Sequence, residues 1–310
     1  MPWTVPLFDG YKTIDLRFKD GAGNVSDPLS ATVILDTTAP TGWVAVADDA
    51  YAVNSTSTTV ETWASDMNGP VTMRVRNGGD AWPASWVPAG GVQSWTLPAG
   101  NGTKTVSVEF KDAAGNITLI KQSVILDTIA PTGALTIDAG APATPATAAT
   151  LGLTAVDANA PIDMRLRDAS GVWGEWQPFR DSESWTLPGA DGAKAVEVQY
   201  RDIAGNLSDP IDGSILLDRV APVTTDNADG LRHRSYHLVL SPTDATSGVV
   251  LTEYRIDGHA WREGTSVTLR LAVHRKPASL TRGAHTIDYR STDAAGNVES
   301  IKSCTVILGL

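Results

Sequence analysis

The sequence predicts an all-β fold, arranged as a tandem array of antiparallel β-sandwich modules of about 91 residues each. One short phrase recurs four times, as FKDGAGN, FKDAAGN, YRDIAGN and STDAAGN, and ends at Asn24, Asn116, Asn206 and Asn297. Apolar and polar residues alternate in KTVSVEF, KAVEVQY and HTIDYRS, a pattern typical of half-buried strands. Gly, Asn, Asp and Pro lie between these segments and indicate frequent turns.

The second repeat shows the expected strands in chain order. We expect strands at 42–47, 57–65, 71–76, near SWTLP at 94–98, at 104–110 and at 121–126. The DAAGN turn joins the last two, because Gly115 can adopt a positive φ and the Asp and Asn side chains can bond nearby backbone amides. No helix longer than about two turns is expected, because the period-two alternation persists along the chain.

The repeats divide the chain into four parts. We expect the C-terminal half of a module (strands E to G) at 1–38, complete modules at 39–129 and 130–220, and a terminal module at 221–310. Half a sandwich leaves an apolar sheet face uncovered. Three alternatives therefore stay open for 1–38: the chain belongs to a longer array, another subunit completes the half module by strand complementation, or the half module packs on the next domain.

Composition narrows the classes of function. The chain has 310 residues, of which 42% are hydrophobic and 19% charged, and its net charge is −11. An acidic chain of this kind makes nucleic acid an unfavourable partner, because phosphate binding needs a basic surface. No apolar run reaches the roughly 18 residues that a membrane span requires. The single cysteine, Cys304, excludes an internal disulfide and is expected to be a small half-buried hydrophobe.

The linking and turn motifs resemble those of a known class of repeat. The phrases ILDTTAP, ILDTIAP and LLDRVAP connect the repeats, and each D-x-A-G-N turn follows an alternating strand. With these motifs the chain resembles the Ig-like and fibronectin-III-like modules of bacterial secreted and surface proteins. The last repeat, with TEYRIDGHAW and GAHTIDYRSTDAAGNVE, is similar to the OmpL47-type repeat family. The resemblance implies Ig-like sandwiches, an extracellular or cell-surface location of bacterial type and no catalytic activity.

The expected function is non-enzymatic. The sequence contains no GxSxG, HExxH or P-loop pattern, and its recurrent carboxylates occur in every unit, whereas an enzyme needs one site. We expect a structural or adhesive array, such as a stalk, adhesin or filament segment, with rigid interdomain junctions. The alternatives are a carbohydrate-binding accessory array of a secreted enzyme and a self-assembling sheath or surface-layer subunit. The expected partners are accordingly a surface receptor, a glycan or identical subunits.

The Asp of the linking phrase predicts calcium at the junctions between modules. It recurs as Asp36, Asp127 and Asp218, whereas the last repeat carries Gly309 at this position. In an Ig-like sandwich the linker lies beside the B–C and F–G loops of the next module, and oxygen ligands from these places suit Ca²⁺. The three predicted sets are Asp36, Asp66, Asp112 and Asn116; Asp127, Asp157, Asp202 and Asn206; and Asp218, Asp244, Asp293 and Asn297. The alternative is that these residues only cap turns.

Two further groups are candidates for ligand binding. Trp86 and Trp176 follow the strands that carry MRVR and MRLR, and we expect them to be exposed rings able to stack on sugars. The last repeat departs from its neighbours by an insertion at 271–280, which is locally basic. Variable loops on a shared scaffold often carry specificity, so a partner-binding surface is expected there. The residues concerned are His274, Arg275 and Lys276.

Overall fold

The structure, a computed structural model, describes residues 4–271 and 280–309. The predicted insertion residues His274, Arg275 and Lys276 lie outside the described residues. The chain forms two compact units, Met1–Ala130 with Arg201–Leu207, and Pro131–Tyr200 with Ser208–Leu310.

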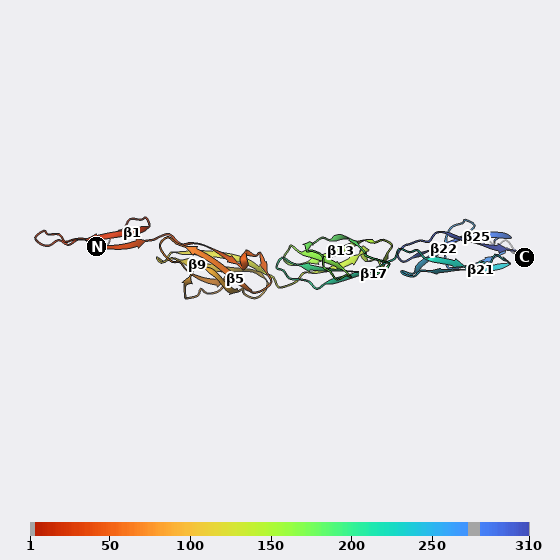
Figure 1. The fold of residues 1–310 in the computed structure, drawn as a ribbon, viewed down its shortest axis with the longest axis horizontal. Helices are drawn as coiled ribbons and strands as arrows, with labels where there is room; N and C mark the ends of the chain where they lie inside the picture. The colour runs from red at the N-terminus through yellow and green to blue at the C-terminus, as the bar shows by residue number, and fades with distance from the viewer. Residues whose placement is uncertain (1–3, 272–279, 310) are drawn as a thin grey trace. The chain divides into compact units, whose positions relative to one another are not determined.

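The first unit contains a two-stranded hairpin and one complete β-sandwich (Figure 1). Its strands are β1 (Gly10–Leu16), β2 (Leu29–Leu35), β3 (Thr41–Val46), β4 (Ala52–Val53), β5 (Ser57–Ser65), β6 (Thr72–Asn77), β7 (Val87–Pro88), β8 (Gly91–Thr96), β9 (Gly102–Lys111) and β10 (Ile117–Leu126). The hairpin is β1–β2, and the sandwich packs the sheet β3-β5-β8 against the sheet β4-β10-β9-β6-β7. This is the Ig-like arrangement, in which a strand A segment switches sheets and pairs with strand G.

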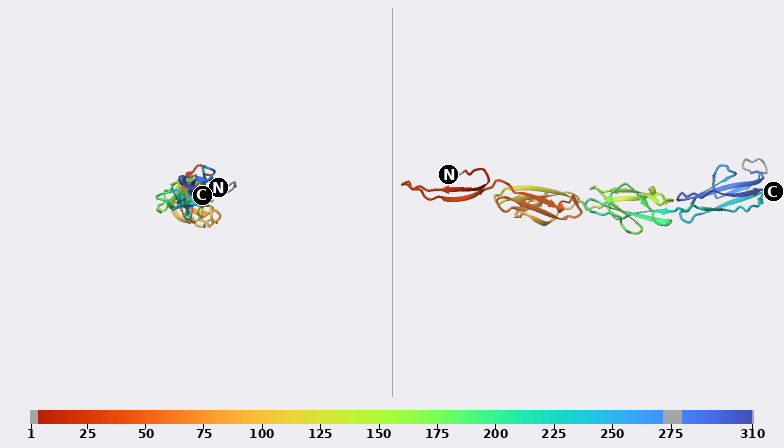
Figure 2. Two further views of the ribbon diagram at one scale, coloured as in Figure 1. Left: turned by 90° about the vertical axis from the view of Figure 1, so that its right-hand side faces the viewer. Right: turned by 45° about the horizontal axis from the view of Figure 1, so that its top comes forward.

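The second unit contains two further sandwiches with the same order of strands (Figure 2). The strands of one are β11 (Thr132–Ile137), β12 (Ala143–Thr144), β13 (Ala148–Val156), β14 (Asp163–Asp168), β15 (Gln177–Pro178), β16 (Ser182–Thr186), β17 (Gly192–Arg201) and β18 (Ile211–Leu217). The strands of the other are β19 (Val223–Asp226), β20 (Arg232–His233), β21 (Ser235–Thr243), β22 (Val249–Ile256), β23 (Arg262–Glu263), β24 (Ser266–Arg270), β25 (Gly283–Asp293) and β26 (Lys302–Leu308). Three-stranded and five-stranded sheets therefore recur with the sequence repeat.

The prediction of an all-β fold is confirmed. The helical segments among residues 4–271 and 280–309 are two 3-10 turns of three residues each, η1 (Ala47–Asp49) and η2 (Asp138–Gly140). The sequence did not predict the short strands β4, β12 and β20, because two residues are too few for alternation to be recognised. Within the described part of the chain, no helix has the length and apolar character needed to cross a membrane.

Alternation along the strands builds each core. In β9, Val106, Val108 and Phe110 are fully buried, and β6 supplies Met73 and Val75 from the neighbouring strand of the same sheet. The β-branched side chains pack well against a pleated surface, and their burial removes apolar area from water. Each sandwich therefore has its own hydrophobic core, and the loops at its ends are held in place by strands on both sides.

The hairpin β1–β2 repeats the sequence of the β9–β10 hairpin without the rest of a sandwich. Leu16 and Phe18 occupy the repeat positions of Val108 and Phe110, which are fully buried, yet they are 49% and 64% exposed. The hairpin is paired over its whole length, from Gly10–Leu16 to Leu29–Leu35. One apolar face of this hairpin is thus uncovered among the described residues.

Candidate metal centres

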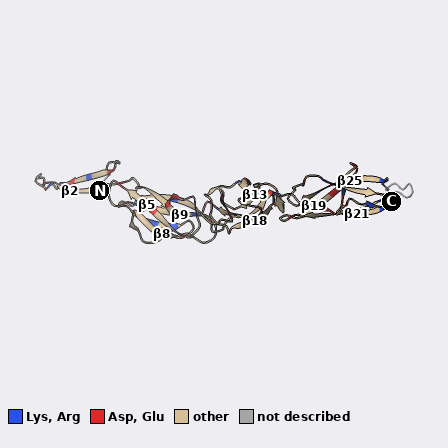
Figure 3. Ribbon diagram, turned by 45° about the vertical axis from the view of Figure 1, so that its right-hand side comes forward, with Lys and Arg blue, Asp and Glu red and all other residues tan. Residues whose placement is uncertain are grey.

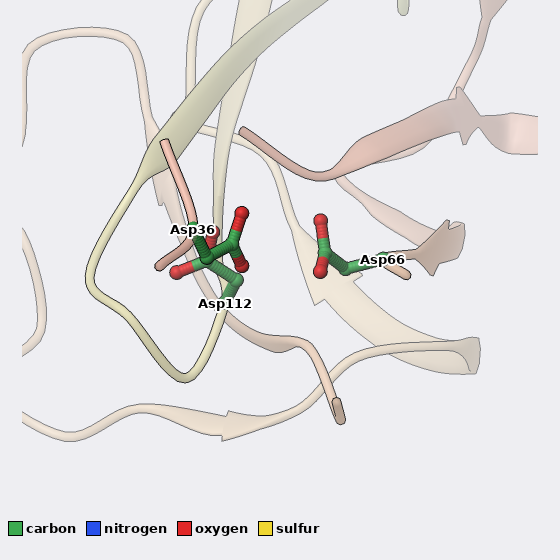
Figure 4. Close-up of side chains that lie close together, drawn as sticks. All are labelled: Asp36, Asp66 and Asp112. Atoms are coloured by element: carbon green, nitrogen blue, oxygen red, sulfur yellow. The ribbon is translucent and has the colours of Figure 1, made fainter. Parts of the chain in front are cut away.

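The first candidate centre lies where the hairpin leads into the first sandwich. Asp36 follows β2, Asp66 follows β5 and Asp112 follows β9, and one carboxylate oxygen of each lies within 4.8 Å of the other two. Figure 4 shows Asp36 beside Asp112, with Asp66 facing them from a separate strand end. Three segments far apart in the sequence thus direct acidic side chains to one point, as the repeat pattern predicted.

The turn after β9 holds the Asp112 carboxylate in its ionised form. Its Oδ1 accepts hydrogen bonds from the backbone N–H groups of Gly115 (2.6 Å) and Asn116 (2.9 Å). Gly115 has a φ of 100°, which a residue with a Cβ would adopt only with strain. Burial raises the pKa of Asp112, but the hydrogen bonds from Asn116 and the turn outweigh it and bring the pKa below its ordinary value. Asp112 is therefore a buried anion.

Asn116 links the turn to the linker. Its Nδ2 donates to Oδ2 of Asp112 at 2.8 Å and to the backbone carbonyl of Asp36 at 3.2 Å. Asn206 and Asn297 repeat this bridge, to the carbonyls of Asp127 (2.8 Å) and Asp218 (2.9 Å). The sequence predicted these amides as oxygen ligands, whereas in the structure their nitrogen atoms fasten the linker to the loop.

The second predicted set is divided between the two units. Asp127 and Asp202 belong to the first unit and are 1% and 4% exposed, with a carboxylate oxygen of each within 4.8 Å of the other. Oδ1 of Asp127 accepts from Nδ2 of Asn101 at 3.2 Å. Asp157 belongs to the second unit and follows β13, where its Oδ1 accepts from the backbone N–H of Asn159 at 2.7 Å.

The third set is complete within the second unit. Asp218 follows β18, Asp244 follows β21 and Asp293 ends β25, and their carboxylate oxygens again lie within 4.8 Å of one another. Asp218 is fully buried and Asp293 is 1% exposed. The backbone N–H of Ser247 donates to Asp218 (3.0 Å) and to Asp244 (2.9 Å), so the loop after β21 contacts the linker directly.

Burial and hydrogen bonds also compete at Asp218. Burial raises its pKa, but hydrogen bonds from Ser247 and Val220 lower it by more, and the pKa lies below its ordinary value. Two ionised carboxylates 4.8 Å apart repel by about 3 kcal/mol at an effective dielectric constant of about 20. In the described residues no Lys or Arg forms an ion pair with the carboxylates of the first or third set. Among the described residues, hydrogen bonds alone therefore oppose the repulsion in these two sets.

The donor set fits a hard cation. Asp36 and Asp66 each keep an Oδ2 that accepts no hydrogen bond from the described residues, and so does Asp244 in the third set. Ca²⁺ takes six to eight oxygen ligands at about 2.3–2.6 Å and tolerates irregular geometry. Carboxylates from three separate segments match this chemistry better than the nitrogen and sulfur sets that Zn²⁺ prefers.

The tryptophans predicted to be exposed are half-buried and covered by cations. The Trp86 ring lies 4.6 Å from the Arg74 guanidinium and 4.0 Å from Nζ of Lys111. The Trp176 ring lies 4.5 Å from the guanidinium of Arg165. Sequence spacing could not reveal these contacts, because the cations come from strands β6, β9 and β14 and their positions depend on strand register. In Figure 3 Lys and Arg occupy short, separate segments of the ribbon.

Sequence reasoning missed the two tryptophans that the structure exposes. Trp43 and Trp63 are 44% and 50% exposed, on β3 and β5. An alignment of the repeats contained a signal, because Ala134 and Thr154 occupy the same positions in the next module. Tryptophan at an outward position that elsewhere holds a small or polar residue is not required by the core.

Comparison with known proteins gave matches among solved structures. No protein-family model and no curated protein matches the sequence. The chain is similar to a tetra-tandem repeat in the extending region of a large adhesion protein, at 21% identity over 98% of this chain and 82% of that chain, with a TM-score of 0.35. It is also similar to a structure of a bacterial ice-binding adhesin (16% identity, 88% of this chain and 100% of that chain, TM-score 0.39) and to fibronectin(III)-like modules of Clostridium thermocellum CbhA (14%, 56% and 94%, TM-score 0.37). The likeness of the last repeat to the OmpL47-type family stays a prediction.

Proposed function

We propose that the chain is a non-enzymatic structural and adhesive array of the extracellular space or the cell surface, of bacterial type, in which Ca²⁺ stiffens the junctions between modules. The observation that carries this proposal is the recurrence of one construction: a linker Asp meets two loop Asp residues of the module that follows it. The sets Asp36/Asp66/Asp112 and Asp218/Asp244/Asp293 repeat it with the same spread of oxygen atoms. Turn capping alone would not require acids from three separate segments to converge.

The chemistry of the centres supports an extracellular location. Sites built from a few carboxylates in extracellular modules bind Ca²⁺ with dissociation constants of about 10⁻⁴–10⁻³ M. Such sites would fill at the calcium concentrations found outside cells and stay empty at those of the cytosol. A junction that is loose without calcium and stiff with it suits an array that holds a surface receptor or glycan at a distance from its anchor.

The uncovered hairpin supports an additional contact with another subunit. Phe18 and Leu16 lie at positions that the complete sandwiches bury. Strand complementation would cover them and supply the main-chain partners that β1 and β2 lack. A Phe18→Asp variant would then lose the association. Tyr11→Asp, at an exposed position on the opposite face of β1, would keep it. Light scattering over a range of concentrations measures the mass, and a wild-type chain that stays monomeric throughout would contradict complementation by a second copy.

Calcium removal tests the main proposal. Millimolar calcium is about one to ten times such a dissociation constant and would stabilise the folded state by about 0.4–1.4 kcal/mol per site, so it should raise the melting temperature of the whole chain above its value in EDTA. In Asp66→Asn the melting transition of the first unit should lose the part of its calcium dependence that comes from the first centre. Differential scanning calorimetry with small-angle scattering measures stability and junction stiffness together.

An exposed acid outside the centres provides the matched control. Asp80 lies in the turn after β6 and is exposed, and Asp80→Asn should keep the full calcium response. Equal melting temperatures and scattering curves in calcium and EDTA would leave the aspartates as turn-capping residues only. In that case Asp66→Asn should raise stability in both buffers, because it relieves the repulsion between Asp66 and the neighbouring carboxylates.

A further inference from the structure

The outer face of the sheet β3-β5-β8 carries the two exposed tryptophans of the described residues. Trp43 of β3 and Trp63 of β5 are directly opposed in the strand register, so their Cβ atoms are about 4.5–5.5 Å apart. Val44 and Thr62, which adjoin the two tryptophans in the sequence, are buried, so the tryptophans point away from the core. The pair therefore presents two aromatic side chains to solvent from neighbouring strands.

Neither indole has a partner among the described residues. In the described part of the chain, neither ring stacks on another ring or a cation, and neither indole N–H donates to a protein atom. Three other tryptophans of the same sandwich differ: Trp82 and Trp86 are covered by cations, and Trp95 donates to Asn77 at 2.8 Å. Buried or covered tryptophans serve packing, whereas an uncovered pair of large rings is the mark of a contact surface.

The pair is confined to one module. The register partners at the same positions are Ala134 and Thr154 in β11–β13, and Thr225 and Ser241 in β19–β21. Both other sheets form with the same pairing and without aromatic side chains there. The fold therefore does not need the tryptophans.

The remaining outward side chains of this sheet decide the class of ligand. The strands of this face present many hydroxyl groups to solvent, one carboxylate and no Lys or Arg; the outward residues besides the pair are Thr41, Ser57, Thr59, Glu61, Ser65, Val92, Ser94 and Thr96, while Ala45 is buried. An anionic ligand would find no cation here, and a cationic one only Glu61. The face suits an uncharged ligand that is flat and apolar on one side and carries hydroxyl groups along its edges.

We propose that the outer face of β3-β5-β8 binds a neutral polysaccharide, with the C–H faces of adjacent pyranose rings stacked on Trp43 and Trp63. Sugar hydroxyl groups at the ring edges would exchange hydrogen bonds with the threonine and serine hydroxyls of the flanking strands, such as Thr41 and Ser65. The free indole N–H groups would donate to sugar oxygen atoms. This face is separate in chemistry from the acidic centres, and its binding needs no calcium.

Titration with neutral glucan hexasaccharides tests the proposal. Cellohexaose, laminarihexaose and maltohexaose are added to the full chain in calcium and in EDTA, and tryptophan fluorescence and calorimetry record binding. We expect at least one hexasaccharide to bind in both buffers. Trp43→Ala and Trp63→Ala should each weaken it by about tenfold or more, as is usual for a central aromatic contact.

Tyr51→Ala is the matched control, because Tyr51 is a 63% exposed aromatic residue of the same module outside this sheet. It should leave binding unchanged. Binding that is retained in both tryptophan variants would overturn the proposal, and so would the absence of binding by all three glucans. If instead the wild-type chain forms a dimer that Trp63→Ala abolishes, the face is an interface between copies and the saccharide assignment is wrong. Binding in EDTA separates this outcome from a failure of the calcium junctions.

Discussion

The sandwiches formed by β3–β10 and by β11–β18 place an aromatic ring at a core position where the last sandwich, β19–β26, places a polar side chain. In the first, Phe110 of β9 is fully buried against Met73. Tyr200 and Met164 repeat this pair in the next sandwich. In the last, the position of the aromatic ring is taken by Ser291, which is 1% exposed.

The glycines beside the aromatic rings explain why these residues change together. A Cβ at Gly42 would lie 3.0 Å from Cε2 of Phe110, and one at Gly133 would lie 2.6 Å from Cε2 of Tyr200. The last sandwich has Thr224 at this position, and the space left by the missing ring admits its side chain. The glycine accompanies the ring in both sandwiches, and a Cβ there would also meet a backbone carbonyl, that of Trp63 at 2.7 Å or, closer still, that of Thr154.

A hydrogen-bonded network fills the space in the last sandwich. Oγ of Ser291 lies 2.7 Å from Oγ1 of Thr224 and 2.9 Å from Oγ1 of Thr252. Glu299, 7% exposed, accepts hydrogen bonds from the backbone N–H groups of Thr224 (3.0 Å) and Ser291 (2.8 Å) and pairs with Nζ of Lys302 at 3.1 Å. Every polar group of the network thus has a partner, which is the condition for burying such groups without a large penalty. The comparison teaches that polar groups can replace this apolar contact only when all of their hydrogen-bond partners are introduced with them.

Replacement of Phe110 alone, without the polar residues that surround Ser291 in the last sandwich, should have the largest effect on stability. Phe110→Ser introduces the residue of the last sandwich without its partners, so it leaves a cavity and an unsatisfied hydroxyl. We expect a loss of about 4 kcal/mol in the free energy of unfolding, measured by urea denaturation and by hydrogen exchange of β9. Phe110→Tyr, which copies the third repeat, should cost less than about 1.5 kcal/mol. Equal losses in the two variants would show that the position tolerates no change and would break the comparison.

Removal of the network's acid should have the next largest effect. Glu299→Ala leaves two backbone donors and Lys302 without their acceptor, and we expect a loss of about 3 kcal/mol. Burial raises the pKa of Glu299, but the hydrogen bonds from Thr224 and Lys302 lower it by more, and the net pKa lies below its ordinary 4.5. The stabilisation is therefore complete above about pH 4.5 and is lost as the pH falls through the folded-state pKa. Glu299→Gln should abolish this loss of stability at acid pH, measured as the free energy of unfolding against pH. If the loss is unchanged in the variant, other carboxylates cause it.

The last sandwich also differs from the other two in the basic side chain at the start of β25. Nε2 of His285 lies 2.9 Å from the carbonyl oxygen of Thr281, and Nδ1 lies 2.7 Å from Oδ2 of Asp257. Lys104 and Lys194 hold the same repeat position and donate to the carbonyls of Ala99 and Ala190. The last sandwich alone makes this contact with a group that titrates near neutral pH.

The titration of His285 should have the smallest effect, about 1 kcal/mol, the size of one net hydrogen bond. Burial lowers the pKa of His285, but the bonds to Asp257 and Thr281 raise it by more, and it lies above its ordinary 6.5. The stabilisation is thus complete below about pH 6.5 and is lost as the pH rises through the folded-state pKa. Unfolding of the last sandwich measured across neutral pH should show this loss, and His285→Gln should flatten it. A slope that persists in His285→Gln would contradict the assignment.

The sequence predicted the repeated features well and the individual ones poorly. The all-β fold and the acids Asp66 and Asp244 could be predicted because period-two alternation and turn motifs are local and recur in each unit. The placement of Trp86 could not be predicted, because its contact with Arg74 depends on which residues two strands bring opposite each other. Glu299 was missed for a related reason: its partners are 75 and 8 residues away, in Thr224 and Ser291, and only the packed sandwich brings them together.

The parallel pairing of β4 with β10 bears on how such a module responds to mechanical force. The backbone N–H of Ile125 donates to the carbonyl of Tyr51 at 3.1 Å, and that of Asp127 donates to the carbonyl of Val53 at 2.9 Å. In the strand register Ala52 pairs with Ile125 and Val53 with Leu126. Tension applied at the two ends of a module pulls on the start of β4 and the end of β10, which lie at opposite ends of the paired segment. These hydrogen bonds are then loaded along the strand direction and must break together, whereas an antiparallel hairpin pulled from its open end would separate one bond at a time. The same two-residue strand recurs as β12 and β20, so each sandwich resists extension at the point where the chain leaves it.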